Sequence, residues 1–329
     1  MYEYPYHTES LSDYAFLITG GAGFIGSNLV EYLVRYGAGK VRVLDNLSTG
    51  HKRNIAPFLS HPGFEFIQGD IRDAEVCRRA CAGMDFVSHQ AALGSVPRSV
   101  KDPVTTNEVN VGGFLNVLET ACREKSVRKM VYAASSSTYG DSMEMPKTED
   151  RIGKPLSPYA VTKYVNELYA EVFSGLYGFH TVGLRYFNVF GPRQDPDGPY
   201  AAVIPLFIRA ALAGAAPDIH GDGEQTRDFT FVENAVQANI RALLDGRGLQ
   251  RHEVVNIACG DTVSLNGLWY MLSSMTGVSI PPVYGPSREG DVRNSLADIH
   301  KAGALLGYKP AFDVRKGLDI TYQFYKSSV

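Results

Sequence analysis

Short apolar runs alternate with longer amphipathic segments along the first half of the chain. The apolar runs predict β-strands, and the longer segments have the apolar spacing of helices. This alternation is typical of a parallel sheet that helices cover on both faces. It predicts strands at residues 15–19, 41–45, 64–68, 86–90, 130–134 and 181–186. Strands in this βα order predict an α/β fold with a doubly wound parallel sheet, the Rossmann fold.

The pattern changes after about Asn188. Glycines and prolines become frequent between Gly191 and Gly223, with helix-like stretches between them. We therefore predict a Rossmann domain at residues 13–187 and a smaller C-terminal α/β domain at residues 188–329. A short β-branched run at residues 254–258 predicts a strand that returns to the main sheet.

The composition excludes several functional classes. The chain has 329 residues and a net charge of −3, which argues against nucleic acid as a partner because phosphate binding needs a basic surface. Hydrophobic residues make up 44% of the chain, as in a folded globular protein. The most apolar stretch, residues 201–213, contains Pro205 and Arg209 and is shorter than the roughly 20 residues that a membrane helix needs. We expect no membrane partner.

The N-terminal residues predict the location of the protein, and the cysteines and histidines bear on disulfides and metal binding. Residues 1–14 contain no Lys or Arg and lack the apolar run of a secretory signal, so we expect a cytoplasmic location. The four cysteines include no CxxC pair, and the histidines show no metal-binding spacing. We expect neither disulfides nor a metal site.

A glycine-rich segment directly follows the first predicted strand. Gly20, Gly23 and Gly26 form a GxxGxxG pattern, and a helical pattern follows them. Glycines permit a tight turn and a close approach of the backbone to a pyrophosphate, which then faces the helix N-terminus. The alternative is a glycine-rich loop that binds no nucleotide. The position of the motif within a βαβ unit favours dinucleotide binding.

Asp45 ends the second predicted strand, 19 residues after Gly26. An acid at this place accepts hydrogen bonds from the adenosine ribose hydroxyls and repels a 2′-phosphate. The expected cofactor is therefore NAD. Lys52 and Arg53 lie nearby in the sequence and leave NADP as the alternative.

Tyr159 and Lys163 stand four residues apart in a predicted helix that starts after Pro158. Residues with this spacing share a helix face. A neighbouring ammonium favours the phenolate of a tyrosine, whose ordinary pKa is about 10, and so lets it act as a base. Ser135, Ser136 and Ser137 follow the fifth predicted strand, at the sheet edge where such folds bind ligands. The alternative is a packed aromatic residue and a surface cation.

Together, these motifs resemble the extended short-chain dehydrogenase/reductase family over essentially the whole chain. The matching segments are GGAGFIG at 20–26, DNLSTG at 45–50, GDIRD at 69–73, SSSTYG at 135–140 and PYAVTK at 158–163. The resemblance implies NAD as the cofactor. It implies that the NAD-binding residues are Gly20, Gly23, Phe24, Ile25, Gly26, Asp45, Asn46, Ser48, Thr49, Gly50, Asp70, Ile71, Gln90, Ala91, Ala92, Tyr159 and Lys163.

The resemblance also implies catalytic roles. Tyr159 would be the base that removes a sugar hydroxyl proton, and Lys163 its electrostatic partner. Ser135 would hydrogen-bond the reacting oxygen, a role that Ser136 could share. Dehydratases of the family carry Asp and Glu at the places of Ser136 and Ser137, and decarboxylating members carry Glu at the latter. Dehydration and decarboxylation are therefore disfavoured.

Arginines in the second half indicate a diphosphate site, because guanidinium groups donate in pairs to oxygen. The resemblance is greatest to UDP-N-acetylglucosamine 4-epimerases. It implies that a UDP-sugar is bound by Gly94, Ser95, Ser135, Asn188, Ala202, Val203, Arg227, Arg288, Asp291 and Ser295. Ser295 stands where epimerases restricted to non-acetylated sugars carry a tyrosine, so it leaves space for an N-acetyl group. The alternative is that Ser295 is simply a small loop residue.

These implications predict reversible C4 epimerisation of UDP-N-acetylglucosamine and UDP-N-acetylgalactosamine through a 4-keto sugar, with tightly bound NAD. UDP-glucose and UDP-galactose remain possible substrates. The alternatives are an epimerase or 4-keto reductase of another nucleotide sugar, and a non-enzymatic NAD-binding sensor. The family further implies a homodimer that forms through helices near residues 107–125 and 159–177.

Overall fold

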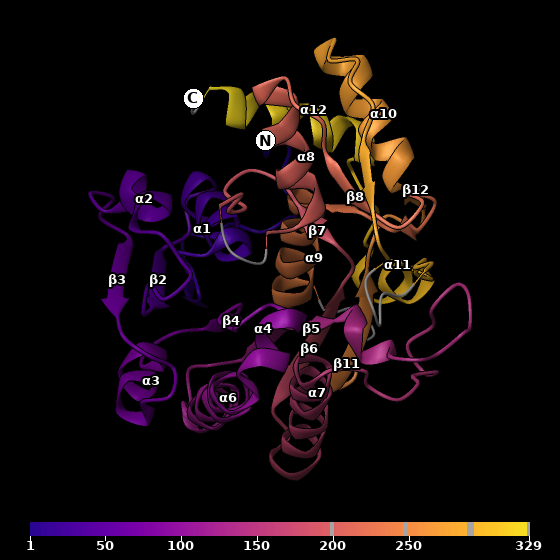
Figure 1. The fold of residues 1–329 in the computed structure, drawn as a ribbon. Coiled ribbons are helices and arrows are strands. Elements are labelled where there is room, and N and C mark those ends of the chain that lie inside the picture. The colour runs from indigo at the N-terminus through magenta and orange to yellow at the C-terminus, as the bar shows by residue number, and fades with distance from the viewer. Residues whose placement is uncertain (198–200, 246–248, 288–292, 328–329) are drawn as a thin grey trace.

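The computed structural model describes residues 1–197, 201–245, 249–287 and 293–327 (Figure 1). Within these residues, seven parallel strands form the main sheet in the order β11-β6-β5-β4-β1-β2-β3. Their bounds are β1 Ala15–Thr19, β2 Lys40–Asp45, β3 Phe64–Gln68, β4 Phe86–His89, β5 Lys129–Ser135, β6 His180–Tyr186 and β11 His252–Ile257. The predicted doubly wound α/β fold is confirmed, and the first six strands end within one residue of their predicted bounds.

Helices cover both faces of this sheet. One face packs against α1 (Phe24–Arg35), α9 (Val232–Leu244) and α11 (His300–Leu306), and the other against α3 (Ala74–Cys81), α6 (Phe114–Arg123) and α7 (Pro158–Tyr177). Leu29 and Leu33 of α1 are fully buried, and so are Val117 and Leu118 of α6. Each such side chain contributes about 1.5–3 kcal/mol by leaving water. This packing fixes the carboxyl ends of the strands at one common edge.

The second half of the chain contributes to the main sheet. Strand β11 pairs in parallel with β6, from His252 opposite Thr181 to Ile257 opposite Tyr186. Helix α9 contacts β4, β5 and β6. The sheet and its cover are therefore completed by residues that follow the glycine-rich and proline-rich segment.

Short elements connect the strands to the helices. They are α2 Lys52–Ile55, η1 Ala56–Phe58, α4 Val96–Lys101, α5 Pro103–Asn107, η2 Glu108–Gly113 and η3 Ser136–Tyr139. Of these, η2 is a single π-helical turn that leads directly into α6. Across the described ranges, no helix is both long and apolar enough to cross a membrane.

A smaller α/β unit, in the upper part of Figure 1, packs against Phe24 and Ile25 at the start of α1. Its helices α8 (Val203–Ala213), α10 (Leu265–Thr276) and α12 (Val314–Lys326) enclose Phe207, Trp269 and other apolar residues. Three strand pairs complete it: β7 (Val189–Phe190) with β10 (Thr230–Phe231), β9 (Thr226–Arg227) with β12 (Val263–Ser264), and β8 (Asp218–His220) with β13 (Val283–Gly285).

Candidate cofactor and substrate site

A cavity of about 550 Å³ lies at the carboxyl ends of β1, β2 and β4. Loops that follow these strands form most of its wall. The predicted cofactor residues in the wall are Gly20, Gly23, Phe24, Ile25, Gly26, Asp45, Asn46, Ser48, Thr49, Asp70, Ile71, Gln90, Ala91 and Ala92.

The glycines let the backbone segments of this wall approach one another closely. A Cβ on Gly20 would lie 2.6 Å from the nitrogen of Ala91, and a Cβ on Gly26 would lie 2.2 Å from the carbonyl oxygen of Gly20. Helix α1 starts with Gly23 as its N-cap and has no side-chain cap. The first N–H groups of a helix lack intrahelical partners, so this end can donate to a pyrophosphate. The wall therefore fits a dinucleotide.

Asp45 holds the glycine-rich loop against β2. Its Oδ2 accepts a hydrogen bond from the N–H of Ala22 at 2.9 Å, and its Oδ1 accepts one from the N–H of Leu47 at 2.8 Å. Burial raises the pKa of this carboxyl group. Gly50 lies behind it, where a Cβ would come within 3.0 Å of Oδ2. An acid at the end of β2 suits the ribose hydroxyls of NAD.

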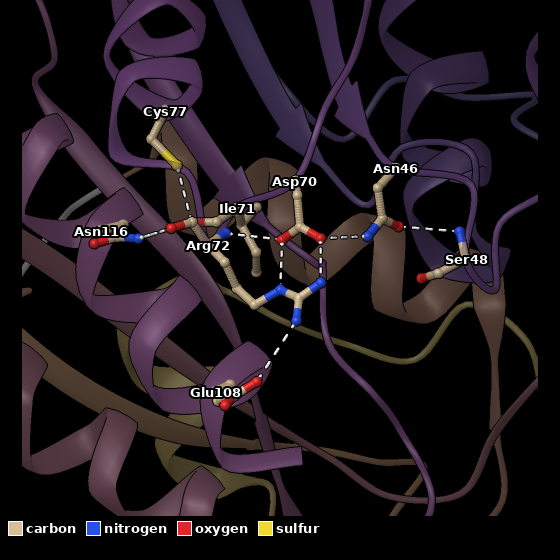
Figure 2. Close-up of polar contacts among 8 residues, drawn as sticks. All are labelled: Asn46, Ser48, Asp70, Ile71, Arg72, Cys77, Glu108 and Asn116. Carbon is tan, nitrogen blue, oxygen red and sulfur yellow. Dashed lines mark hydrogen bonds and ion pairs between the residues drawn. The ribbon is translucent and has the colours of Figure 1, made fainter. Parts of the chain in front are cut away.

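Asp70 lies at the centre of the polar network in Figure 2. Arg72 folds back and donates to both carboxylate oxygens, at 3.1 and 2.8 Å, and Asn46 donates through Nδ2 at 2.9 Å. The hydrogen bonds from Arg72 lower the pKa of Asp70 to about 2. Glu108 of η2 lies 3.6 Å from Arg72. The network therefore joins the loops after β2 and β3 through an ionised carboxylate.

Helix α7 carries Tyr159 and Lys163. Ser157 caps this helix by accepting a hydrogen bond from the N–H of Ala160 at 3.1 Å. Lys163 is 2% exposed, and its Nζ donates to the carbonyl oxygen of Ala133 in β5 at 2.7 Å. The same Nζ lies 6.0 Å from the centre of the Tyr159 ring. The helix thus brings both side chains to the end of β5.

Burial changes the proton affinity of this pair. It lowers the pKa of Lys163 to about 8, while the negative charge of Glu167 acts in the opposite direction. Burial raises the pKa of Tyr159, and a hydrogen bond with Ser135 lowers it. Lys163 is therefore mainly charged at neutral pH.

Ser135 is paired with Ser137 in the structure. The two Oγ atoms are 2.8 Å apart, and the N–H of Ser137 donates to Oγ of Ser135 at 3.2 Å. The sequence offers Ser136 as the second catalytic hydroxyl, and this role stays a prediction. The hydrogen bonds favour Ser137 as the residue that orients Ser135.

Asn110 connects the cavity wall to α7. Its Oδ1 accepts from the N–H of Leu93 at 2.8 Å, and its Nδ2 donates to Oγ1 of Thr162 at 3.2 Å. Oγ of Ser99 accepts from the N–H of Tyr159 at 3.0 Å. Asn110 belongs to the π-helical turn η2, a kind of turn that is frequent at functional sites. These bonds fix α7 relative to the loop beside the cavity.

A second cavity of about 410 Å³ lies in the smaller unit. Of the predicted substrate residues, Asn188, Val203 and Arg227 line it, Gly94 and Ser95 line the first cavity, and Ala202 lines both. The two cavities therefore adjoin at Ala202. This arrangement suits a ligand whose sugar lies near the cofactor and whose diphosphate lies near Arg227.

Other predicted residues are not among the described residues that line the two cavities. Arg288 and Asp291 lie outside the described residues. Among those that the structure describes, Gly50, Ser135, Ser136, Tyr159, Lys163 and Ser295 line neither cavity. Ser295 is half-buried beside β9, where its N–H donates to the carbonyl oxygen of Thr226 at 3.2 Å.

Several polar residues in the cavity walls are not singled out by the sequence. They are His51, Arg98, Gln194, Asp195, Asp218, His220 and Gln225. His51 directly follows the predicted cofactor segment at residues 45–50, so its place in the sequence could have identified it as a residue of the cavity wall. The others come from segments whose approach depends on tertiary packing.

Comparisons with known proteins identify the family of this chain. The model of the NAD dependent epimerase/dehydratase family matches residues 16–258. A putative UDP-glucose 4-epimerase of Methanocaldococcus jannaschii is 40% identical over 314 residues, which cover 95% of this chain and 98% of that protein. The UDP-glucose 4-epimerase of Mycolicibacterium smegmatis is 38% identical over 313 residues, which cover 94% and 98%.

Solved structures are similar over the same extent. A UDP-N-acetylglucosamine 4-epimerase from Methanobrevibacter ruminantium M1, in complex with UDP-N-acetylmuramic acid, is 38% identical with a TM-score of 0.90, covering 96% of this chain and 99% of that chain. A UDP-glucose 4-epimerase from Thermotoga maritima with UDP-glucose is 37% identical with a TM-score of 0.88, covering 95% and 99%. The chain therefore belongs to the NAD dependent epimerase/dehydratase family and is an enzyme whose cofactor is NAD.

Proposed function

We propose that this enzyme catalyses the reversible C4 epimerisation of UDP-N-acetylglucosamine and UDP-N-acetylgalactosamine. UDP-glucose and UDP-galactose are further candidate substrates. The observation that carries the proposal is the placement of Tyr159 and Lys163 on one face of α7, with Nζ of Lys163 6.0 Å from the centre of the Tyr159 ring. The relatives that are named UDP-sugar 4-epimerases support it.

Tyr159 is the residue that we assign to the sugar 4-hydroxyl. As the phenolate, it accepts the hydroxyl proton, and Lys163 stabilises the negative charge. Ser135 donates a hydrogen bond to the reacting oxygen, and Ser137 orients Ser135 through the 2.8 Å contact. The residues in the wall of the first cavity would hold NAD, which would supply a hydride acceptor and donor at C4 of the sugar. The reaction causes no net oxidation, so NAD stays bound between turnovers.

The second cavity supports a UDP-sugar as the substrate. Arg227 and Asn188 lie in its wall and can donate to a diphosphate. Ser295 supports acceptance of an N-acetyl group only through its place in the sequence, because it lines neither cavity. The similar structures include a UDP-N-acetylglucosamine 4-epimerase and a UDP-glucose 4-epimerase, so both substrate classes belong in the test.

We also propose that the enzyme is a cytoplasmic homodimer. Val161, Leu168, Val172 and Leu176 are exposed on α7 at the spacing of one helix face. Helix α7 contacts α4 and α5, which expose further valines. A contiguous exposed apolar face marks an interaction site, and two copies would bury it in a bundle of paired helices.

Proton NMR of the purified enzyme with UDP-N-acetylglucosamine and no added NAD tests the function. We expect UDP-N-acetylgalactosamine from the wild type and none from Tyr159→Phe. Reaction of UDP-glucose alone would contradict the acetylated preference. The absence of reaction with either sugar, even with NAD supplied, would overturn the proposal, and NADH-dependent reduction of a 4-keto sugar would point to a reductase.

A further inference from the structure

Asp228 is a fully buried residue in the turn between β9 and β10. Its Oδ1 accepts from the N–H of Cys259 at 2.9 Å. Its Oδ2 accepts from the N–H groups of Gly260 at 3.0 Å and Ala297 at 3.3 Å. Cys259 and Gly260 follow β11 of the main sheet, whereas Ala297 belongs to a later segment that packs against Tyr139 and Phe187. One carboxylate therefore joins three segments that are distant in the sequence.

The proposed UDP-sugar residues surround this carboxylate. Asn188 donates through Nδ2 to the carbonyl oxygen of Asp228 at 3.0 Å, and Arg227 is its neighbour in the chain. Arg227 donates through Nη1 to the carbonyl oxygen of Arg293 at 3.1 Å. Ser295 stands two residues before Ala297, which is bonded to Asp228. Movement of Asp228 would therefore displace residues on both sides of the proposed diphosphate site.

The hydrogen bonds require an ionised carboxyl group. A carboxylate has only acceptors, whereas a protonated carboxyl group directs an O–H donor toward N–H groups and loses at least one of the bonds. Burial raises the pKa of Asp228 to about 7. The group thus changes its charge in the neutral range, and the hydrogen bonds that it accepts change with it.

Other titratable groups near this carboxyl are Cys259, Asp261, Tyr308 and the adjacent Arg227. Burial raises the pKa of Cys259 to about 12 and the pKa of Tyr308 well above its ordinary value, so both stay neutral around pH 7. The exposed Asp261 raises the pKa of Asp228 through its negative charge. Asp261 therefore provides a control, because it places a negative charge near Asp228 but does not accept the hydrogen bonds that join the three segments.

We propose that Asp228 is a positioning residue for the UDP-sugar: its carboxylate holds Asn188, Arg227 and the 295–297 segment in the binding geometry, so that protonation weakens substrate binding. The inference rests on the proposed function. Asp228 is not among the described residues that line the second cavity. The proposal therefore assigns control of substrate affinity to a residue outside the cavity wall.

The test is calorimetric titration of the NAD-containing enzyme with UDP-glucose from about pH 5.5 to about pH 8.5, with no turnover assay involved. The diphosphate diester of UDP-glucose keeps its charge over this range. We expect the wild-type Kd to rise toward low pH, by up to about tenfold per pH unit below pH 7, because binding then requires loss of one proton. Asp228→Asn should bind about 5 to 100 times more weakly at the alkaline end, and its Kd should not change with pH.

Two control variants locate the source of this slope. Asp261→Asn removes the neighbouring charge and should keep the wild-type slope, displaced to lower pH. His220 lines the second cavity. The pH dependence of the Kd for UDP-glucose should persist in His220→Gln. In the epimerase assay, Asp228→Asn should raise KM more than it lowers kcat, with unchanged NAD content.

A wild-type Kd that is constant across this range would overturn the inference, and this measurement remains available if Asp228→Asn does not fold. Equal loss of melting temperature, NAD content and UDP-glucose affinity in that variant would show a general structural role and would also contradict it. A pH-dependent binder without epimerase activity would refute only the proposed function. An active epimerase with constant affinity would refute only this inference, and a protein that binds no UDP-sugar would refute both.

Discussion

Nε2 of His51 lies 3.3 Å from Oδ2 of Asp195, and both residues line the cofactor cavity. His51 comes from the loop after β2, whereas Asp195 comes from the segment after β7. The pair therefore connects the two halves of the molecule across the cavity that we assign to NAD.

We expect His51→Ala to release NAD faster than the wild type. The effect should be about two- to fivefold, because both side chains are partly exposed and such pairs contribute up to about 1 kcal/mol. The measurement is the NAD content after timed gel filtration. His300→Ala removes a comparable contact, with Asp298, and should retain NAD like the wild type. Equal retention by all three proteins would contradict the prediction.

Tyr159→Phe should lower kcat about 10²- to 10⁴-fold, because the variant lacks the phenol that accepts the sugar proton. The NAD content and melting temperature should remain close to those of the wild type. The NMR assay checks the rate, and absorbance after denaturation checks the cofactor. Tyr4→Phe, at a tyrosine that is 75% exposed, is the control and should have full activity. Substantial activity of Tyr159→Phe would show that another group is the base.

Lys163→Met should abolish the reaction yet raise the melting temperature near pH 7. Wild-type Lys163 has a pKa of about 8 against an ordinary 10.5, so the folded protein carries a buried charge at a cost in stability. Between these values the folded state binds fewer protons than the unfolded state, and wild-type stability rises with pH. The advantage of the variant should therefore shrink above about pH 8. Melting curves at matched NAD content check this, and a difference that does not change with pH would contradict it.

Gly26→Ala should lower both stability and NAD content, because its Cβ would overlap the carbonyl oxygen of Gly20. Gly175→Ala is a matched substitution in α7, where an added Cβ meets open space. It should raise the free energy of unfolding by about 0.5–1 kcal/mol, since alanine favours a helix over glycine. Denaturant titration and cofactor absorbance distinguish the two, and similar behaviour of both variants would contradict the close-packing argument.

Val172→Asp should convert the proposed dimer to a monomer. The side chain is 52% exposed on the apolar face of α7, and burying a carboxylate there at an interface would be costly. Sedimentation velocity measures the change. Tyr270→Asp, on the exposed side of α10, should leave the assembly unchanged. A monomeric wild type would refute the homodimer directly.

The main sheet could be predicted because short runs rich in apolar and β-branched residues alternate with helical segments, as expected for a parallel sheet covered by helices. Gly20, Gly26 and Asp45 could also be predicted, since each follows a strand at a spacing that the dinucleotide fold requires. These positions depend on local geometry, and the structure places all three in the cavity wall.

Contacts between distant segments could not be predicted from the sequence. The resemblance implies a role for Arg227, but the bonds of Asp228 to Cys259 and Ala297 depend on how β11 and a later loop meet. Likewise, adjacency in the chain favours Ser136, whereas the turn of η3 brings Ser137 to Ser135. The direction of each side chain within a short turn decides such pairings. The hydrophobic periodicity of helices and strands does not predict that direction.

The late position of β11 has a consequence for synthesis of the protein. Until residues 232–244 have left the ribosome, the sheet lacks the part of its cover that α9 provides, and until residues 252–257 follow, β6 has an unpaired edge. A nascent or truncated chain ending near residue 187 would present this edge to other chains and would tend to aggregate. Gene fragments that stop there are therefore poor sources of an isolated nucleotide-binding domain, whereas ones that extend past residue 257 can close the sheet.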